Sequence, residues 1–268
     1  MADENINLSR LVPKVLEVMA PVATWLRATF YTFDRNQTEE KGLHDLVSYV
    51  DRESEERLLQ GLLPLIPGSA VLAEESGAAG DSDWVWVVDP LDGTTNFIHG
   101  MPFFCISIGL LFRGKPVAGW IAEAHAGDFF YAWEGGGAWK NGLPIQVASV
   151  EQAEKALFAT GFPVKQFERI EEVTHAVGQF MQHTRGLRRF GTAAMDLAWT
   201  ATGKFAGFYE FGLSPWDVAA GAVIVREAGG TVTDFQGGEA WLHGKEICAS
   251  NGKVHQDMLK LIHPNTTS

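Results

Sequence analysis

The sequence has little cysteine, no long apolar run and a shortage of basic residues. Cys105 and Cys248 are the only two cysteines, too few for a disulfide framework or a cysteine metal site, and their apolar surroundings predict buried thiols. The longest apolar runs, such as residues 103–112, reach about half of the roughly 20 residues that a membrane-spanning helix needs. The acidic, polar start MADENINLSR is unlike a signal peptide. We therefore expect a soluble, cytoplasmic protein without membrane contact.

The shortage of basic residues also limits the kinds of partner that the protein is expected to bind. The chain carries 33 Asp and Glu against 21 Lys and Arg, a formal net charge of −12. This balance disfavours nucleic-acid binding, whose affinity comes from Lys and Arg on phosphates, and binding to anionic lipid. Hydrophobic residues make up 46% of the chain and charged residues 20%, which is an ordinary globular balance. The 268 residues allow one large domain or two modest ones with a substantial core.

Helices and strands are predicted from the hydrophobic periodicity. In the first half, helical spacing predicts a helix over residues 8–30, with kinks or a late start caused by Pro13 and Pro21, and a second amphipathic helix over 45–64. Short apolar runs rich in β-branched and aromatic residues predict strands at 71–75, 84–90, 105–112 and 116–124. A hairpin is expected at Gly114 and Lys115, and a loop over EGGGAWKNG, residues 134–142.

The pattern changes after about Pro144, although no low-complexity linker marks the change. Helices are expected at 166–183, 193–203 and 215–228, alternating with short strands at 156–161, 206–211 and 231–235. We therefore expect a single unit over 1–268, with an α+β half at 1–145 and an α/β half at 146–268.

The most informative stretch is residues 86–100, WVVDPLDGTTNFIHG. An apolar strand ends there in Asp89 and Asp92, and the proline between them fixes the backbone so that both carboxylates can converge with the Leu91 carbonyl. Hard divalent cations prefer such an all-oxygen set. Gly93 and the following Thr-Thr-Asn are typical of the start of a helix, whose free N–H groups would bind an anion. The stretch predicts metal ligands beside a phosphate site, although an Asp-rich turn followed by a helix cap would have the same sequence pattern.

Three further segments supply carboxylates, each with an ordinary structural explanation. Glu74 and Glu75 in AEESG are adjacent, so only one can point inward from an extended chain. Asp217 lies in the first turn of the apolar helix at SPWDVAAG, where capping and the helix dipole would also explain it. Asp51 lies in the charge run DRESEER, which by itself indicates a solvated helix face.

Together these segments carry a family resemblance. DPLDGTTNF followed by PFFCISIGL resembles the first signature of the inositol monophosphatase family, and SPWDVAAG followed by REAGG resembles the second. AEES is similar to the upstream glutamate motif and RRFGTAAMDL to the segment between, in family order from Lys41 to about Ser250. The double Arg and the Pro before Trp216 are more similar to the bacterial branch. The resemblance implies a layered αβαβα fold, a homodimer, and Mg²⁺-dependent, lithium-sensitive hydrolysis of a phosphate monoester.

The resemblance also implies a role for individual residues. Glu74, Asp89 and the Leu91 carbonyl would hold one Mg²⁺, and Asp89, Asp92 and Asp217 a second, with a third, weaker ion near Glu74. Thr94, paired with Asp51, would orient and activate the attacking water, with Glu74 also counted as catalytic. The N–H groups of Gly93 and Thr94 would hold the phosphate. The residues that would face the alcohol portion of the substrate are Asp92, Gly191, Thr192, Ala193, Glu210 and Asp217.

Several alternatives remain open at this point. The leading substrate is myo-inositol 1-phosphate or a similar phosphorylated polyol, but the same chemistry suits fructose 1,6-bisphosphate, a 3′-phosphoadenosine nucleotide or histidinol phosphate. A regulatory protein-binding role of the fold is an alternative of another class.

A few positions depart from the family pattern or carry no clear role. Ala206 stands where the family often has Asp, with an expected structural consequence. Arg189 is either a dimer contact or a contact to a more anionic substrate, and Lys41 is either a functional or a solvated loop lysine. The histidines without metal-ligand spacing are treated as structural or surface residues; they are His99, His125, His175 and His183.

Overall fold

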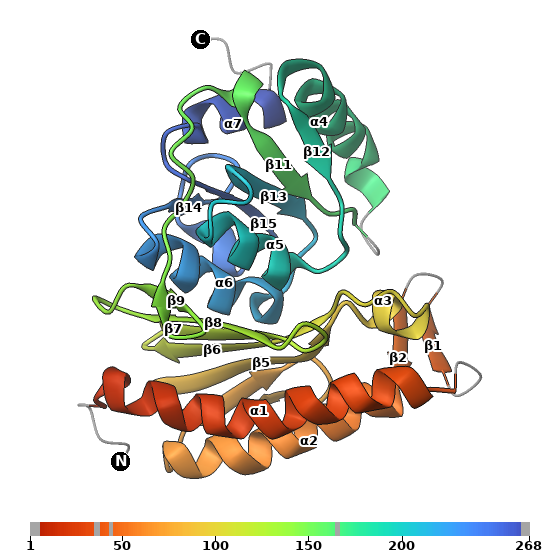
Figure 1. Ribbon diagram of the computed structural model, residues 1–268, viewed down its shortest axis with the longest axis vertical. Helices are drawn as coiled ribbons and strands as arrows, with labels where there is room; N and C mark the ends of the chain where they lie inside the picture. The colour runs from red at the N-terminus through yellow and green to blue at the C-terminus, as the bar shows by residue number, and fades with distance from the viewer. Residues whose placement is uncertain (1–5, 35–37, 43–44, 164–166, 264–268) are drawn as a thin grey trace.

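The computed structural model describes residues 6–34, 38–42, 45–163 and 167–263, of which 38–42 and 45–48 are described by their backbone alone. Helices and sheets alternate in five layers (Figure 1). Helices α1 and α2 cover one face of an eight-stranded sheet, α5 and α6 separate that sheet from a five-stranded one, and α4 and α7 cover the far side. The predicted αβαβα layering is thus confirmed.

The helices and strands are divided between two sheets and the helical layers around them. The helices are α1 (Leu8–Thr32), α2 (Tyr49–Leu62), α3 (Thr94–Ile98), α4 (Ile170–His183), α5 (Ala193–Ala201), α6 (Pro215–Glu227) and α7 (His255–Ile262). The larger sheet contains β3 (Ala70–Ala73), β4 (Gly77–Ala79), β5 (Trp84–Asp92), β6 (Cys105–Phe112), β7 (Lys115–Glu123), β8 (Asp128–Trp133), β9 (Ala138–Lys140) and β10 (Leu143–Pro144). The smaller contains β11 (Leu157–Thr160), β12 (Gly186–Arg188), β13 (Gly207–Phe211), β14 (Thr231–Thr233) and β15 (Glu246–Ser250). A separate hairpin pairs β1 (Thr38–Gly42) with β2 (Asp45–Ser48).

The two sheets differ in strand direction. In the larger sheet β3 and β5 run parallel and the other pairs are antiparallel, including the predicted hairpin between β6 and β7. In the smaller sheet β11 is parallel to both of its neighbours, β12 and β13. Parallel pairing needs crossover connections, which α4 and α5 provide in this sheet.

Some predicted boundaries are wrong. The first helix does not start late, because the Asn7 side chain accepts a hydrogen bond from the Arg10 N–H and caps it at Leu8. It continues through both prolines to Thr32. The second helix begins only at Tyr49, because the preceding residues pair with β1. Part of the predicted loop over 134–142 is the strand β9, while its glycines do form a turn.

Helix α6 packs closely against the larger sheet because two of the sheet residues that face it are glycines, which have no side chain. Gly109 and Gly119 are paired across β6 and β7. A Cβ atom at Gly109 would lie 2.8 Å from the Cβ of Ala219, and one at Gly119 would lie 2.7 Å from the Cα of Ala220. These distances are too short for any other residue, so the two glycines set the separation between the layers.

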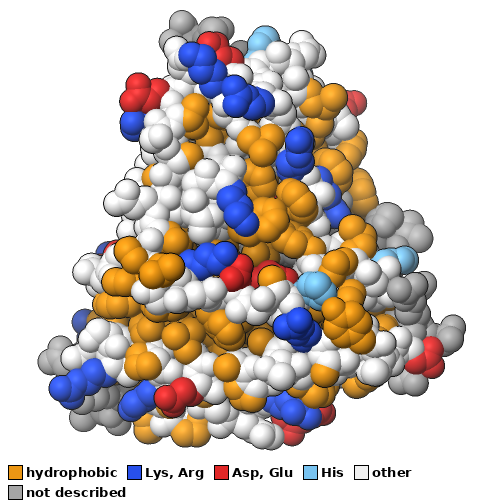
Figure 2. Space-filling model, in the orientation of Figure 1, with side chains coloured by type: hydrophobic (Ala, Val, Ile, Leu, Met, Phe, Trp, Pro, Cys, Tyr) orange, Lys and Arg blue, Asp and Glu red, His pale blue; other side chains and the backbone are white. Residues whose placement is uncertain are grey.

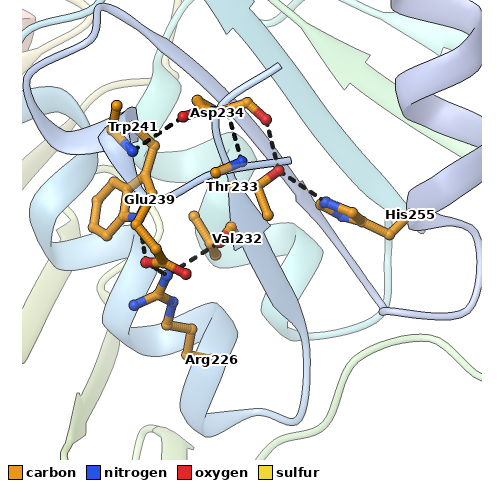
Figure 3. A network of polar contacts seen from close by, with 9 residues as sticks. Arg226, Val232, Thr233, Asp234, Glu239, Trp241 and His255 are labelled. Carbon is orange, nitrogen blue, oxygen red and sulfur yellow. Dashed lines mark hydrogen bonds and ion pairs between the residues drawn. The ribbon is translucent and has the colours of Figure 1, made fainter. Parts of the chain in front are cut away.

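A buried polar network fastens the C-terminal elements (Figure 3). The hydroxyl of Thr233 donates to the Asp234 carbonyl at 2.6 Å and contacts Nε2 of His255 at 2.9 Å. The other ring nitrogen of His255 lies 2.9 Å from the hydroxyl of Ser250. Because the single hydroxyl proton of Thr233 goes to the Asp234 carbonyl, Nε2 of His255 donates to Thr233. Burial lowers the pKa of His255 and so favours the neutral ring, whose Nδ1 then accepts from Ser250, and the histidine joins α7 to β14 and β15.

Both cysteines are buried and free, as predicted. Among the described residues, no helix combines the length and apolar character needed to cross a membrane.

Candidate functional site

The site begins where β5 leaves its ladder with β6. The pairing of β5 with β6 is irregular between Asp89 and Asp92, where Pro90 has no N–H to donate. This irregular end of β5 is held by two hydrogen bonds, from the Ser54 hydroxyl of α2 to the Pro90 carbonyl at 2.9 Å and from the Leu91 N–H to Oδ1 of Asp89 at 3.0 Å. Asp89 is only 2% exposed, so this carboxylate has been removed from water at considerable cost.

Asp92 joins this end of β5 to the second half of the chain. Its Oδ2 accepts the N–H of Ala194 at 2.8 Å, in the first turn of α5. Thr192, which caps the same helix through the Met195 N–H, also bonds to Asp92. The sulfur of Cys105 lies 3.9 Å from the same oxygen. Asp92 is thus oriented by groups from two separate segments, the start of α5 and the start of β6.

Gly93 and Thr94 follow directly. Gly93 has the left-handed φ of 94°, which glycine adopts without strain, and it begins the short helix α3. The hydroxyl of Thr94 lies 2.9 Å from Oδ1 of Asp51 and 3.0 Å from the Leu91 carbonyl oxygen. Asp51, placed by the first turn of α2, is 1% exposed, so the solvated-face explanation for this residue is wrong.

The two adjacent glutamates after β3 face different places, as predicted, although they lie in the turn between β3 and β4 and not in an extended strand. Glu74 lines the same cavity as Asp92 and Thr94. Glu75 lines a separate surface depression beside α2, where its N–H donates to the buried Glu55 at 2.9 Å.

Asp217 reaches the site from the first turn of α6. Its Oδ2 accepts the Ser214 N–H at 2.6 Å, so the residue does cap the helix. It also lines the cavity and raises the pKa values of Glu74 and Asp89. Capping and a functional position are therefore compatible at this residue.

One cavity of about 310 Å³, which we call the site cavity, is lined by Glu74, Asp92, Gly93, Thr94 and Asp217, whereas Asp51 and Asp89 are buried and do not line it. It lies where the turn after β5 meets the segments that precede α5 and α6. Figure 2 shows acidic side chains near the centre of one face of the molecule, with Lys and Arg side chains on either side. All of the residues predicted to face the substrate line it: Asp92, Gly191, Thr192, Ala193, Glu210 and Asp217.

Four acids form what we call the carboxylate cluster: Glu74, Asp89, Asp92 and Asp217. Burial, with Asp217 as the next cause, raises the pKa of Glu74 to about 8. Burial and then Glu74 raise the pKa of Asp89 well above its ordinary value. Burial raises the pKa of Asp92 to about 6 against the opposing hydrogen bond from Ala194. The neighbouring charges that act most strongly on Asp89 are all negative, so the cluster holds excess negative charge that a cation would neutralise.

The donor set fits a hard divalent cation in its chemistry. The cluster and the Leu91 carbonyl offer only oxygen ligands, which Mg²⁺ prefers. In the described part of the chain, no group of three His, Cys, Asp or Glu side chains is already arranged to hold a metal ion. Instead, Glu74 and Asp89 share a hydrogen bond, while Asp92 and Asp217 accept from backbone N–H groups. The residues therefore fit Mg²⁺ by chemical type and charge.

Glu210 also lines the cavity. It lies on β13, and its carboxylate packs so closely on Gly161 that a Cβ there would overlap it. Burial and then Asp196 raise its pKa well above the ordinary value. Asp196 itself is 1% exposed on α5, and its Oδ1 has no hydrogen-bond partner in the described residues.

Sequence reasoning missed several of these residues. An acid inside the apolar run AAMDLA was a signal for Asp196. Gly161 and Lys245, which also line the cavity, had no such signal, because their role depends on contacts between distant segments. Arg189 lines the cavity too, with its guanidinium over the Phe162 ring, which favours a substrate contact over a purely interfacial role.

The structure also locates the other positions that depart from the family pattern or carry no clear role. Ala206 is buried, in keeping with a structural role. Lys41 lies in β1, and its side chain is outside the described residues. Of the four histidines treated as structural or surface residues, His125 contacts the hydroxyl of Tyr31 at 2.9 Å. The other three, His99, His175 and His183, are exposed.

The comparisons with known proteins identify the family. The model of the inositol monophosphatase family matches residues 12–267. The chain belongs to the inositol monophosphatase family. Family membership identifies it as a phosphatase, and this family is generally Mg²⁺-dependent.

Individual relatives agree with this assignment. The chain is 42% identical over 231 residues to the putative Nus factor SuhB of Neisseria meningitidis serogroup B, covering 85% of this chain and 88% of that protein. It is 42% identical over 228 residues to the inositol-1-monophosphatase of Synechocystis, covering 83% and 78%. The crystal structure of extragenic suppressor protein suhB from Bartonella henselae matches with a TM-score of 0.87 and 37% identity, covering 94% and 99%.

Proposed function

We propose that the protein is a Mg²⁺-dependent phosphomonoesterase whose substrate is myo-inositol 1-phosphate or a similar small phosphorylated polyol. The observation that carries this proposal is that Glu74, Asp92, Asp217 and Thr94 line one cavity. The buried Asp89 shares a hydrogen bond with Glu74, and the buried Asp51 accepts one from Thr94. The cavity volume of about 310 Å³ is at the lower end for small-molecule sites, which suits a small substrate.

The carboxylate cluster would hold the metal. Glu74, Asp89 and the Leu91 carbonyl would hold one Mg²⁺ ion, and Asp89, Asp92 and Asp217 a second, with a third, weaker ion near Glu74. When bound, these ions lower the pKa of water, neutralise the phosphate and stabilise the leaving alkoxide.

The protein's own groups position the attacking water and the phosphate. Because Asp51 accepts the proton of the Thr94 hydroxyl, the oxygen lone pairs of Thr94 are free to accept a hydrogen bond from a water. Asp51 then serves as the acceptor behind Thr94 when the water loses its proton. The N–H groups of Gly93 and Thr94 would hold the phosphate, since the left-handed Gly93 turns its backbone towards the cavity.

The other side of the cavity would bind the polyol. Glu210 and Asp217 offer carboxylate oxygens to substrate hydroxyls, and the segment Gly191–Ala193 presents backbone groups beside them. A polyol supplies several hydroxyl donors, which matches this acceptor-rich lining.

Phosphate release tests the proposal. Purified protein should release inorganic phosphate from myo-inositol 1-phosphate with Mg²⁺ and not with EDTA. A panel with fructose 1,6-bisphosphate, a 3′-phosphoadenosine nucleotide and histidinol phosphate, ranked by kcat/KM, would identify the preferred ester. Absence of hydrolysis of every ester in saturating Mg²⁺ would contradict the proposal.

A regulatory role through binding another protein is the second candidate, because the relative from Neisseria meningitidis is named a putative Nus factor. Stoichiometric recovery of a transcription protein, together with negligible phosphatase activity, would favour it. A homodimer and a cytoplasmic location stay predictions. Light scattering tests the homodimer, and cell fractionation tests the location.

A further inference from the structure

Helix α2 buries polar side chains on the face that lies against the site. Its buried residues are Val50, Asp51, Ser54, Glu55, Leu58 and Leu62. Residues at positions i, i+3 and i+4 share one face of a helix, so Asp51, Ser54 and Glu55 point the same way. Removing two carboxylates from water is costly unless each of them is hydrogen-bonded. The partners of these three side chains therefore show what this face of α2 does.

Glu55 holds a different segment from its two polar neighbours. Asp51 and Ser54 bond to the start of α3 and the end of β5. Glu55, which is 4% exposed, reaches the turn between β3 and β4 instead. Its Oε2 accepts the N–H of Glu75 at 2.9 Å, and its Oε1 accepts the N–H of Ser76 at 2.9 Å. Both carboxylate oxygens thus hold successive backbone N–H groups of this turn.

The same turn carries Glu74, a proposed metal ligand, whose backbone is held on both sides. The N–H of Glu74 donates to the Val88 carbonyl at 3.1 Å, one residue before Asp89 on β5. The next N–H along the chain, that of Glu75, donates to Glu55. The two peptide groups that flank the Cα atom of Glu74 are therefore each fixed by a hydrogen bond, one to β5 and one to α2. These two bonds set the direction in which the Glu74 side chain leaves the backbone.

Hydrogen bonds, more than packing, hold the far end of this turn. Ser76 is exposed, and nothing lies within 4 Å of the Cβ position of Gly77, whose φ is 75°. Glu74 itself lies among like charges, because Asp89 and Asp217 are its neighbours. Like charges repel one another, so a loosened turn would let Glu74 swing away from them. The bonds to α2 oppose that movement.

We propose that Glu55 is a positioning residue for Mg²⁺ binding, which holds the turn between β3 and β4 against α2 and so keeps Glu74 in the site cavity. Glu55 does not line that cavity and acts only through the backbone of the turn. The proposal rests on the proposed function, because it assumes that Glu74 is a metal ligand. Since Asp51 lies one helical turn before Glu55, one helix would then position both the metal ligand Glu74 and the partner of Thr94.

Metal affinity measured without substrate tests this role. Mn²⁺, which also takes carboxylate and carbonyl ligands and is paramagnetic, serves as the probe in an electron paramagnetic resonance titration of the purified protein. Glu55→Gln keeps the side-chain shape, but its amide nitrogen is a donor and cannot accept one of the two N–H groups. We expect the apparent Kd for Mn²⁺ to rise by about tenfold.

Phosphate release should show the same effect in its dependence on Mg²⁺. The apparent Kd is the intrinsic Kd divided by the fraction of molecules in the binding-competent form, so a turn that holds Glu74 less often raises the Mg²⁺ concentration for half-maximal rate. Saturating Mg²⁺ itself stabilises the competent form. The kcat of Glu55→Gln in saturating Mg²⁺ should therefore stay within about threefold of the wild type.

Two controls make the same chemical change elsewhere. Glu227, at the end of α6, accepts the N–H groups of Gly135 at 3.0 Å and Gly137 at 2.8 Å, so it holds the turn between β8 and β9 in the same manner. Glu227→Gln should lower the melting temperature and leave the Kd for Mn²⁺ unchanged. Glu56→Gln removes the same charge from the exposed residue beside Glu55, and should change neither quantity.

A double-mutant cycle shows whether Glu55 acts through Glu74. Glu74→Ala alone should raise the Kd for Mn²⁺. Adding Glu55→Gln should then change the Kd by less than about twofold, because the side chain that Glu55 positions is already absent. A full tenfold effect of Glu55→Gln in the Glu74→Ala background would overturn the proposal.

The possible outcomes separate the two proposals. An unchanged Kd in Glu55→Gln, or an equal rise in Glu227→Gln, would overturn the positioning role and leave the phosphatase intact. A wild type that neither binds Mn²⁺ nor releases phosphate from any ester in saturating Mg²⁺ would overturn both. If Glu55→Gln does not fold, Glu55→Asp carries the same test, because it keeps both acceptor oxygens but is one methylene too short, and its Kd should rise in the same direction.

Discussion

The hydroxyl of Thr94 lies 2.9 Å from Oδ1 of Asp51, a residue 43 positions earlier in the chain. Helix α2 carries Asp51 beneath the turn after β5, and a second bond from Ser54 to Pro90 fixes the same helix against the same turn. Two contacts thus determine where the Thr94 oxygen lies relative to the carboxylate cluster.

Removing the Thr94 hydroxyl should lower kcat with little change in KM. Thr94→Val keeps the side-chain shape but loses both the hydrogen bond to Asp51 and the contact to water, and we expect a loss of about 100-fold or more. Steady-state phosphate release measures it. Thr94→Ser keeps the hydroxyl and should keep most of the activity. Full kcat in Thr94→Val would assign the water-positioning role to another group.

Removing the metal, or one of its central ligands, should abolish turnover. EDTA should stop phosphate release and added Mg²⁺ should restore it, because the carboxylate cluster alone repels a phosphate. Asp89→Asn should cost on the order of 100-fold in kcat even in saturating Mg²⁺. Asp83→Asn is the control, since Asp83 is exposed just before the other end of β5 and pairs with Arg113. Near wild-type turnover in Asp89→Asn would show that the metal assignment is wrong.

Lithium should inhibit the enzyme, as membership in this family leads us to expect. The measurement is an inhibition curve for phosphate release at fixed Mg²⁺, with Na⁺ or K⁺ at equal ionic strength as the control for salt. A response to Li⁺ no greater than the response to Na⁺ would count against lithium sensitivity in this member of the family.

A methyl group at Gly161 should weaken substrate binding without touching the metal site. The carboxylate of Glu210 fills the space that a Cβ would need, so Gly161→Ala must displace Glu210. We expect KM for myo-inositol 1-phosphate to rise by several-fold, with a smaller change in kcat. Gly178→Ala is the matched control, because nothing lies within 4 Å of its Cβ position in α4, and alanine there should stabilise the helix by up to about 1 kcal/mol. An unchanged KM in Gly161→Ala would remove Glu210 from the substrate contacts.

His255 should make folding stability depend on pH. Burial lowers its pKa below the ordinary 6.5, so the unfolded chain binds more protons as the pH falls through about 6.5. The contribution of His255 to the free energy of unfolding is therefore complete above that pH and is lost progressively below it. Because other buried groups also titrate, the informative quantity is the stability difference between the wild type and His255→Gln, from urea unfolding at pH 5.5 to 7.5.

The difference in the free energy of unfolding between the wild type and His255→Gln should shrink as the pH falls. The part of this difference that does not change with pH reports the lost hydrogen bonds to Thr233 and Ser250. The exposed His175 on α4 provides the control, because His175→Gln makes the same chemical change without removing a buried hydrogen bond. A pH-independent difference for His255→Gln would mean that the histidine has no depressed pKa in the folded state.

The sequence predicted best those features that depend on local pattern. The strands around residues 84–124 and the helices near α5 and α6 follow directly from hydrophobic periodicity and were found within a few residues. The carboxylates of DPLDG and SPWD were found through motif chemistry. The start of α2 was missed, because residues 45–48 acquire their strand conformation only by pairing with β1.

The parts of the site that depend on distant contacts were harder to predict. Asp51 lies in a charge run typical of a solvated face, and only the packing of α2 against the Pro90 turn buries it. Gly161 and Lys245 were missed entirely, since their significance comes from Glu210 and from the shared cavity. Local patterns identify the chemical groups, whereas tertiary packing decides which of them meet.

The glycine pair between β6 and β7 has a consequence for the site itself. The strand β5, which pairs with β6, carries Asp89, while α6 carries Asp217 and rests on Gly119 through the Ala220 backbone and on Gly109 through the methyl group of Ala219. Neither contact can change by a rotamer switch, so these contacts set how close α6 lies to the sheet that carries Asp89. A larger residue at either glycine would push α6 outward and separate Asp217 from Asp89, two of the proposed metal ligands, although the substitution lies outside the cavity. A substitution at either of these buried glycines would therefore inactivate the enzyme although every residue that lines the cavity is unchanged.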